Sequence, residues 1–330
     1  MAIFGKGKSK DSSSDTTDFF YASDVHGSSR CWNKFLNAGE FYKVKHLVMG
    51  GDLTGKAIVP IQKNSDGSFV VTFAGETERG SSTDELDRVL LSIRHNGMYP
   101  WEATPEEIEH HRNDPKAREE LFEAVMLSEL KRWVDLADAK AEETGVSIYG
   151  IAGNDDSWEC DRVLGSGKHF QLAEDRLVRV GPHEMIACSY SGPTPWKSPR
   201  ELDEESLYQH YRSLAEQVES PETAIFMLHV PPYNSGLDQA REVNYEDLTV
   251  VIRSGQPNEI PVGSTAVRQI IEEYQPLLAL HGHIHESRGV TTIGRTTCIN
   301  AGSDYTTGRL HGAVVKLTLD KVVGKQLVIG

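Results

Sequence analysis

Seven side chains that can bind metal ions occur in five short segments of this 330-residue chain. The segments read Ser-Asp-Val-His-Gly, Gly-Gly-Asp, Gly-Asn-Asp, Leu-His-Val and Gly-His-Ile-His, and they contain Asp24, His26, Asp52, Asn154, His229, His283 and His285. Carboxylate and amide oxygens combined with imidazole nitrogens suit manganese, iron, zinc or nickel better than calcium. Taken together, the five segments predict a site for divalent metal ions.

The spacing within the segments indicates two ions rather than one. Asp24 and His26 are two residues apart, which in an extended segment places both side chains on one side, about 6 to 7 Å apart. His283 and His285 repeat this spacing with two imidazoles, which can serve one ion each. Two ions about 3.5 to 4 Å apart need a bridging carboxylate, and Asp52, which follows a pair of glycines, suits that role.

Predicted strands explain how distant segments could meet. Apolar runs end just before Asp24, Asp52, Asn154 and His229, and a further run leads to the last two histidines. Ligands of open α/β sheets bind at the carboxyl ends of the strands. Amphipathic stretches predict helices over 28–39, over 264–274 and from the Asp114-Pro115 pair to Gly145. This alternation of strands and helices predicts an α/β fold.

We expect one domain with a large insertion. Residues 1–17 read as a solvated tail, and 18–330 as the domain. Residues from about 56 to 145 interrupt the alternation with a predicted hairpin, a polar stretch and the long helix. Such an insertion could shape a substrate cleft or a dimer contact, and the sequence leaves the oligomeric state open.

The order of the motifs resembles that of the calcineurin-like metallophosphoesterases. The segment Gly-His-Ile-His-Glu-Ser with the later Asn-Ala-Gly-Ser is most similar to a small bacterial and archaeal branch of predicted phosphodiesterases, and the resemblance spans about residues 19–320. It implies a four-layer β-sandwich, two mixed sheets flanked by helices, with the metals at one sheet edge. It also implies that one metal is held by Asp24, His26, Asp52 and His285, and the other by Asp52, Asn154, His229 and His283.

One position departs from the pattern of that family. Many members have a histidine after the Gly-Asn pair, where this chain has Asp155. Two neighbouring dications favour the ionised form of a carboxyl group, which makes Asp155 a poor general acid. We therefore expect leaving groups that need little protonation to be favoured, or water to supply the proton, and alkyl monoesters to be poor substrates.

The leading hypothesis is a hydrolase, a metal-dependent phosphodiesterase that cleaves a small or nucleotide-like diester through a metal-bridging hydroxide. Two divalent ions are its expected cofactors, with manganese favoured. The predicted catalytic residues are Asp52, Asn154, Asp155 and His229, with Tyr233 and Arg309 as candidate substrate contacts. Asn300 and Ser303 are expected to orient ligands.

Other activities remain open on the same residues. A phosphomonoesterase, a pyrophosphatase and a nuclease would use the same metal pair. A binding scaffold that kept the fold and lost the chemistry is the alternative from another class. Every predicted ligand position still carries a competent donor, which favours the enzyme.

Composition limits the partners and the compartment. The formal net charge of −15 disfavours binding along duplex nucleic acid, where lysine and arginine must neutralise phosphates. No apolar run approaches the about 18 residues of a membrane helix, and the N-terminus lacks the apolar region of a signal peptide. The four isolated cysteines argue against a disulfide scaffold or a structural zinc site. These features predict a cytoplasmic protein, and the expectation of a small phosphate-ester substrate comes from the metal motifs and the family resemblance.

Overall fold

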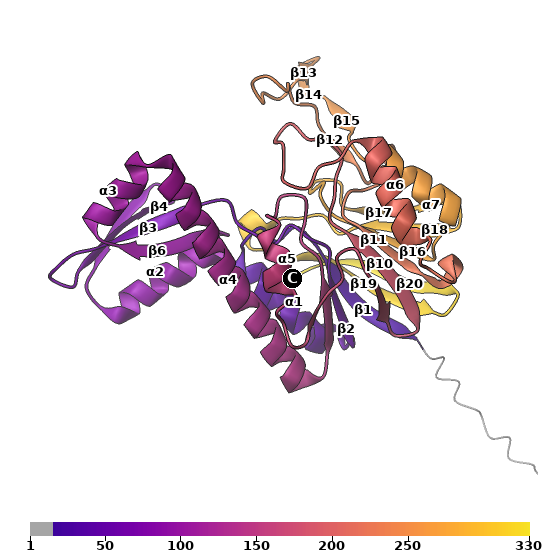
Figure 1. The fold of residues 1–330 in the computed structure, drawn as a ribbon, viewed down its shortest axis with the longest axis horizontal. Coiled ribbons are helices and arrows are strands. Elements are labelled where there is room, and N and C mark those ends of the chain that lie inside the picture. Colours follow the sequence, from indigo (N-terminus) through magenta and orange to yellow (C-terminus); the bar gives the residue numbers. More distant parts are fainter. Residues whose placement is uncertain (1–15) are drawn as a thin grey trace, which may run out of the picture.

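The computed structural model describes residues 16–330. The predicted tail at 1–17 therefore lies almost entirely outside the described residues, and Thr17 already belongs to the first strand. The described chain forms two large sheets, a smaller sheet set to one side, and helices that cover them (Figure 1).

The first large sheet has six strands in the order β20-β19-β1-β2-β7-β8. Its strands are β1 (Thr17–Ala22), β2 (His46–Met49), β7 (Ser147–Gly150), β8 (Phe170–Leu172), β19 (His311–Thr318) and β20 (Lys321–Ile329). Strands β1, β2, β7 and β8 are parallel, whereas β19 pairs antiparallel with both β1 and β20.

The second large sheet also has six strands, in the order β17-β18-β16-β11-β10-β9. Its strands are β9 (Leu177–Val180), β10 (His183–Cys188), β11 (Ile225–Leu228), β16 (Leu278–His281), β17 (Gly289–Ile293) and β18 (Thr296–Asn300). The four central strands are parallel and the two edge strands antiparallel. Because both sheets are mixed and flanked by helices, the predicted α/β class is confirmed.

The two large sheets share one apolar core. Phe19, Tyr21 and Val48 of the first sheet pack in one cluster with Met227 and Leu280 of the second. Successive side chains of a strand point to opposite faces, so the alternate residues of the same strands belong to other clusters. Strands that are buried on both faces must be apolar throughout, which explains the continuous apolar runs of the sequence.

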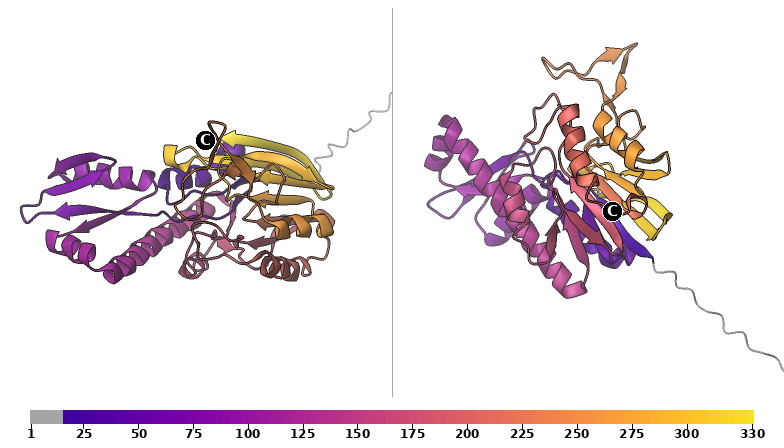
Figure 2. Two further views of the ribbon diagram at one scale, coloured as in Figure 1. Left: turned by 90° about the horizontal axis from the view of Figure 1, so that it is seen from above. Right: turned by 45° about the vertical axis from the view of Figure 1, so that its right-hand side comes forward.

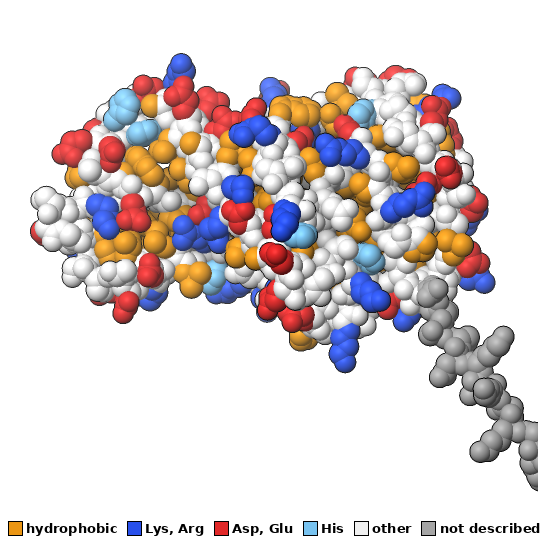
Figure 3. Space-filling model, turned by 60° about the horizontal axis from the view of Figure 1, so that its bottom comes forward, with side chains coloured by type: hydrophobic (Ala, Val, Ile, Leu, Met, Phe, Trp, Pro, Cys, Tyr) orange, Lys and Arg blue, Asp and Glu red, His pale blue; other side chains and the backbone are white. Residues whose placement is uncertain are grey.

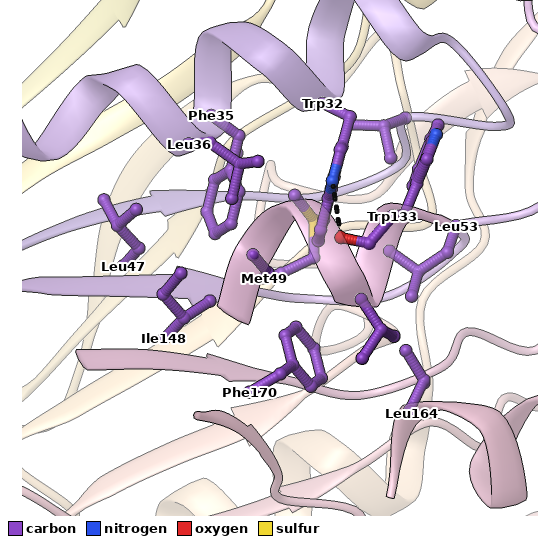
Figure 4. Close-up of a cluster of buried hydrophobic side chains, with 14 of the residues drawn as sticks. Trp32, Phe35, Leu36, Leu47, Met49, Leu53, Trp133, Ile148, Leu164 and Phe170 are labelled. Atoms are coloured by element: carbon purple, nitrogen blue, oxygen red, sulfur yellow. Dashed lines mark hydrogen bonds between the residues drawn. The ribbon is translucent and has the colours of Figure 1, made fainter. Parts of the chain in front are cut away.

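Helices cover the outer face of each large sheet. Against the first sheet pack α1 (Ser29–Tyr42), α4 (Pro115–Thr144) and α5 (Glu159–Leu164), and against the second pack α6 (Glu204–Ala215) and α7 (Thr265–Tyr274). Trp32 of α1 stacks on Trp133 of α4 with ring centroids 4.8 Å apart. The Trp32 indole N–H also donates to the Trp133 carbonyl at 3.2 Å (Figure 4). This contact fixes α4 against the main body.

The insertion forms a small sheet with its own core. Its strands, in the order β5-β4-β3-β6, are β3 (Ile58–Lys63), β4 (Phe69–Phe73), β5 (Glu76–Gly80) and β6 (Tyr99–Ala103), accompanied by α2 (Thr83–His95) and α3 (Pro105–Asn113). The predicted hairpin is confirmed by the antiparallel pairing of β3 with β4. Side chains such as Ile61, Phe69 and Ile93 form a separate cluster. Figures 1 and 2 both show this unit at one end of the molecule.

Helix α4 links the insertion to the main body. The Asp114 carboxylate accepts from the backbone N–H groups of Lys116 and Ala117, with Pro115 at the first helical position, as predicted. The helix ends at Gly145, whose φ of 74° lies in the left-handed region. Its two terminal signals were therefore readable in the sequence.

The remaining elements are short. An arm that projects from the second sheet carries β12 (Gln239–Arg241), β13 (Ile252–Arg253), β14 (Gln256–Pro257) and β15 (Glu259–Pro261), and two 3-10 turns, η1 (Pro221–Thr223) and η2 (Tyr305–Thr307), lie in other loops. Figure 3 shows acidic and basic side chains interspersed over one face of the molecule. Among the described helices, none combines the length and apolar character needed to cross a membrane.

Candidate metal centre

The seven predicted ligands come together where strands of both large sheets end. Asp24 and His26 follow β1, Asp52 follows β2, and Asn154 follows β7, all in the first sheet. The three C-terminal histidines follow β11 and β16 of the second sheet. Each sheet therefore contributes part of the site, as the rule for carboxyl ends of strands predicts.

A first cluster contains Asp24, His26, Asp52 and His285, whose potential ligand atoms all lie within 4.8 Å of one another. The Nε2 atoms of His26 and His285 are 3.0 Å apart. Asp52 Oδ2 lies 3.7 Å from His26 Nε2, and Asp24 Oδ1 lies 3.5 Å from His285 Nε2. These atoms surround a common point, which is the geometry that one cation requires.

A second cluster shares Asp52 with the first. It contains Asp52, His229 and His283, again with potential ligand atoms within 4.8 Å of one another. Asn154 adds a neutral oxygen, because its Oδ1 lies 3.1 Å from His229 Nε2 and 2.8 Å from His283 Nδ1. Within the described residues, Asp52 is the member that belongs to both clusters. Such a shared carboxylate is what a pair of ions needs.

Charge and burial inside the site also fit divalent cations. Asp24 Oδ2 is buried with no hydrogen-bond partner. Burial alone would raise the pKa of Asp52, but the charge of His229 and a hydrogen bond with it hold that pKa well below the usual range. Burial lowers the pKa of His283 to about 4, with the charge of His229 adding to the effect. Metal ions bind ionised carboxylates and neutral imidazoles. Burial opposes the charge of His229, but Asp52 raises the pKa of His229 to about 10, so a bound cation would have to displace this proton.

Four of the predicted ligands have an unusual backbone conformation. Asp24, His26, Asp52 and His283 have φ values of 57°, 38°, 51° and 63°, in the left-handed region that residues other than glycine rarely adopt. The expectation of an extended Asp-x-His segment was therefore wrong. Such conformations persist only where the surrounding structure imposes them, and they gather at functional sites. Space is equally tight, since a Cβ atom on Gly153 would lie 1.9 Å from Asp52 Oδ1.

Neighbouring polar groups orient the ligands. The Nδ1 atom of His229 lies 2.8 Å from the Gly50 carbonyl, which directs Nε2 into the second cluster. Ser303 Oγ donates to the backbone carbonyl of Asp24 at 2.6 Å, and Asn300 Nδ2 donates to the carbonyl of Ile284 at 2.9 Å. Asn300 and Ser303 thus hold the backbone of ligand segments, as expected from the sequence.

A buried carboxylate that sequence reasoning missed ties two ligand turns together. Asp156 is fully buried and accepts hydrogen bonds from the backbone N–H groups of Leu53, Thr54 and Gly153, each at 2.9 Å. It also accepts from the Thr54 hydroxyl at 2.5 Å. The turns that carry Asp52 and Asn154 are therefore joined by one side chain. Its adjacency to the Gly-Asn-Asp motif was the signal that could have revealed it.

A buried arginine holds the same segment from the other side. Arg200 Nε donates to the Asp156 carbonyl at 2.9 Å, and Nη2 donates to the Ser157 carbonyl at 2.8 Å. Its guanidinium pairs with Asp161 at 2.9 Å and lies over the ring of Trp158. Nothing in the local sequence marks Arg200, because its partners are about 40 residues away.

Ser189 links Glu174 to Arg200, because its hydroxyl accepts from Arg200 Nη1 at 3.2 Å and donates to Glu174 Oε1 at 2.8 Å. The buried Glu174 carboxyl makes stability depend on pH. Burial raises its pKa to about 7, although hydrogen bonds from Ser189 partly oppose the shift. The group titrates near pH 4.3 when unfolded. Between about pH 4.3 and 7 the folded chain therefore binds more protons, so the free energy of unfolding falls as pH rises, by about 3 kcal/mol.

Replacing Glu174 with glutamine should remove this pH dependence. Urea denaturation should find the variant more stable than wild type by up to about 3 kcal/mol at pH 8, where wild type buries a charge, and nearly equal at pH 5. Glu76, an exposed residue of β5, gives a control variant, Glu76→Gln, that should follow wild type at both values. A Glu174→Gln difference that is the same at pH 5 and pH 8 would contradict this account.

The other predicted site residues have different surroundings. The backbone N–H of Asp155 donates to Asp52 Oδ1 at 3.1 Å, which places Asp155 beside the clusters. Tyr233 is 39% exposed and bonds through its backbone to Ser264. Arg309 pairs with Asp304 at 4.0 Å. These contacts of Tyr233 and Arg309 do not involve the predicted ligands, and substrate contact by either stays a prediction.

Comparison with known proteins gives partial matches. No protein-family model matches the chain. The chain is 31% identical over 158 residues to the uncharacterized protein MJ1162 of Methanocaldococcus jannaschii. That alignment covers 47% of this chain and 63% of the relative, so the chain spans less than two thirds of the relative's length.

Solved structures show the fold alone. The crystal structure of TT1561 of Thermus thermophilus aligns with a TM-score of 0.50 at 13% identity, covering 96% of this chain and 98% of that one. A second crystal structure aligns with a TM-score of 0.53 at 13% identity, covering 95% and 98%. The alignment with a structure described as a novel archaeal phosphodiesterase covers 95% of this chain and 100% of that one. Its TM-score is 0.34 at 10% identity, so the likeness is weak.

Proposed function

We propose that this chain is a metal-dependent phosphoesterase of the calcineurin-like kind, a phosphodiesterase that hydrolyses a small or nucleotide-like diester. The observation that carries the proposal is the sharing of Asp52 between two clusters of potential ligands. The packing of helices outside two facing sheets supports the four-layer arrangement of that fold. The family resemblance of the motifs supports the reaction.

Each residue has a definite task in this proposal. Two divalent cations, when bound, would lower the pKa of a water and neutralise charge on the phosphoryl oxygens. Asp52 would contribute to both ions, and the remaining members of each cluster would complete the coordination of one ion each. His229, fixed by the Gly50 carbonyl, presents one nitrogen, and Asn154 offers an oxygen without adding charge. No side-chain nucleophile is required.

Metal removal and a substrate screen test the proposal. After chelation, calorimetric titration with Mn²⁺ should show two ions bound per chain, and the reloaded protein should hydrolyse bis(4-nitrophenyl) phosphate faster than 4-nitrophenyl phosphate. Activity with Mn²⁺, Fe²⁺, Zn²⁺ and Ni²⁺ would then rank the metals. Binding of a single ion would overturn the dinuclear site. A folded, metal-loaded protein that is inert towards every ester would favour a binding scaffold.

A further inference from the structure

A lysine from the base of the insertion lies beside the acidic site. Lys56 directly precedes the residues that lead into β3, and its Nζ atom lies 2.6 Å from Asp155 Oδ2. The Tyr305 ring packs on the His26 ring with centroids 4.7 Å apart. Lys56 therefore brings a positive charge to Asp155, whose backbone N–H donates to the predicted ligand Asp52.

Asp155 is held from three directions and so fixes the position of that charge. Its backbone N–H donates to Asp52 Oδ1, and its Oδ1 atom accepts from Ser198 Oγ at 2.6 Å. Its Oδ2 atom is left for the ammonium of Lys56. The Asp155 side chain is 24% exposed and that of Lys56 is 52% exposed. The ammonium is thus bound to Asp155 on one side and partly exposed to solvent on the other.

The backbone before Lys56 is equally constrained. The Gly55 N–H donates to the Tyr99 hydroxyl at 2.6 Å, and a Cβ atom at Gly55 would lie 2.0 Å from the Gly97 carbonyl oxygen. The preceding Thr54 is bound to the buried carboxylate of Asp156. These contacts fix the backbone on the N-terminal side of Lys56, and the pairing with Asp155 then holds the end of its side chain.

We propose that the Lys56 ammonium, positioned by Asp155, contacts the leaving oxygen of the substrate; this inference rests on the proposed phosphoesterase function. As the bond from phosphorus to the leaving oxygen breaks, that oxygen keeps the electron pair, and the ammonium stabilises its charge by a charge-assisted hydrogen bond. Water supplies the hydroxyl group to phosphorus and the hydrogen to the leaving oxygen. Asp155 then acts as a positioning residue and needs no proton of its own.

This contact changes the expected range of substrates. The sequence alone predicted a preference for leaving groups that need little protonation, because Asp155 stands where the family has histidine. Because Lys56 pairs with Asp155 at the position of the family histidine, we expect diesters of weakly acidic alcohols to be substrates too. The chemical class is therefore a phosphodiester whose leaving alkoxide requires charge stabilisation.

The inference can be tested on the manganese-loaded, full-length protein with a series of aryl phosphodiesters. The leaving phenols of this series range from strongly to weakly acidic. In Lys56→Met, kcat/KM should fall by about 100-fold for the least acidic phenol and by less than about threefold for the most acidic, since the charge on the leaving oxygen grows along the series. Lys56→Arg should restore most of the loss. Lys63, which pairs with Glu102 at 3.1 Å on the same insertion, provides the control variant Lys63→Met, which should match wild type.

A binding measurement separates this inference from the proposed function. Inorganic phosphate places an oxygen where the leaving oxygen would be, and its calorimetric affinity should weaken about tenfold in Lys56→Met but not in Lys63→Met, as expected for one lost charge-assisted hydrogen bond. Manganese binding should be unchanged in both. An equal loss of activity for every phenol, or phosphate affinity unchanged in Lys56→Met, would overturn the inference. If wild type hydrolyses no ester, the proposed function and the leaving-oxygen role of Lys56 both fail; if wild type hydrolyses diesters but phosphate affinity is unchanged in Lys56→Met, only the role of Lys56 fails.

Discussion

Asparagine in place of Asp52 should lower kcat/KM for phosphodiesters by about 1,000-fold or more, because the loss of a metal-bridging charge removes several kcal/mol of transition-state stabilisation. Asp52 Oδ2 lies 3.7 Å from His26 Nε2 and 3.5 Å from His229 Nε2, so one atom serves both clusters. Asparagine keeps the shape of the side chain but offers one oxygen and no charge.

Metal titration should show the same defect without any substrate. Wild type should bind two Mn²⁺ per chain, whereas Asp52→Asn should bind one or none at the same concentration. Asp66, an exposed aspartate in the β3–β4 turn, gives the control variant Asp66→Asn, which should bind metal and hydrolyse diesters as wild type does. If Asp52→Asn bound two ions tightly and kept full turnover, Asp52 would not be a bridging ligand between the two ions.

The largest effect on stability is expected at Asp156. Alanine there would leave three backbone N–H groups and one hydroxyl without their acceptor in a buried place, and the free energy of unfolding should fall by about 4 kcal/mol. The two turns it joins carry Asp52 and Asn154, so manganese affinity should fall as well. Urea denaturation of the metal-free protein measures the first effect, and calorimetric titration measures the second.

The adjacent aspartate is a matched control for this experiment. Asp155 is partly exposed and its carboxylate has two partners, Lys56 and Ser198, at the site rim. Asp155→Ala should therefore cost less than about 1 kcal/mol of stability. If Asp156→Ala cost no more than Asp155→Ala, Asp156 would not be the residue that joins the two turns.

The meeting of the seven side chains in space was predictable because its sequence signals are local. An apolar run followed by a ligand residue marks the carboxyl end of a strand, and parallel strands bring such ends to one edge. The same is true of helix α4, whose Asp114-Pro115 start and Gly145 stop are terminal signals. Helix α6, which was not predicted from the sequence, has comparable signals: Asp203 caps it, and Leu207, Tyr211 and Leu214 recur at helical spacing.

The rest depends on contacts that no local pattern encodes. The burial of Asp156 and Arg200 follows from how the 154–161 segment folds onto neighbours distant in sequence. The approach of Lys56 to Asp155 spans 99 residues and requires the insertion to leave the main body at one particular place. Left-handed backbone at Asp24 and His26 is likewise imposed by tertiary structure, because the intrinsic preference of both residues is for other conformations.

The ligands are divided between the two large sheets. Bound ions would therefore link the N-terminal half of the chain to the C-terminal half. An ion held by Asp24 and His285 binds only while both sheets keep their places, so its affinity is added to the stability of the folded state. At a free metal concentration 100 times the dissociation constant, this linkage is worth about 2.7 kcal/mol. When metal is scarce, more molecules would unfold and be degraded by proteases. The folded molecules that remain would lack bound metal and be inactive.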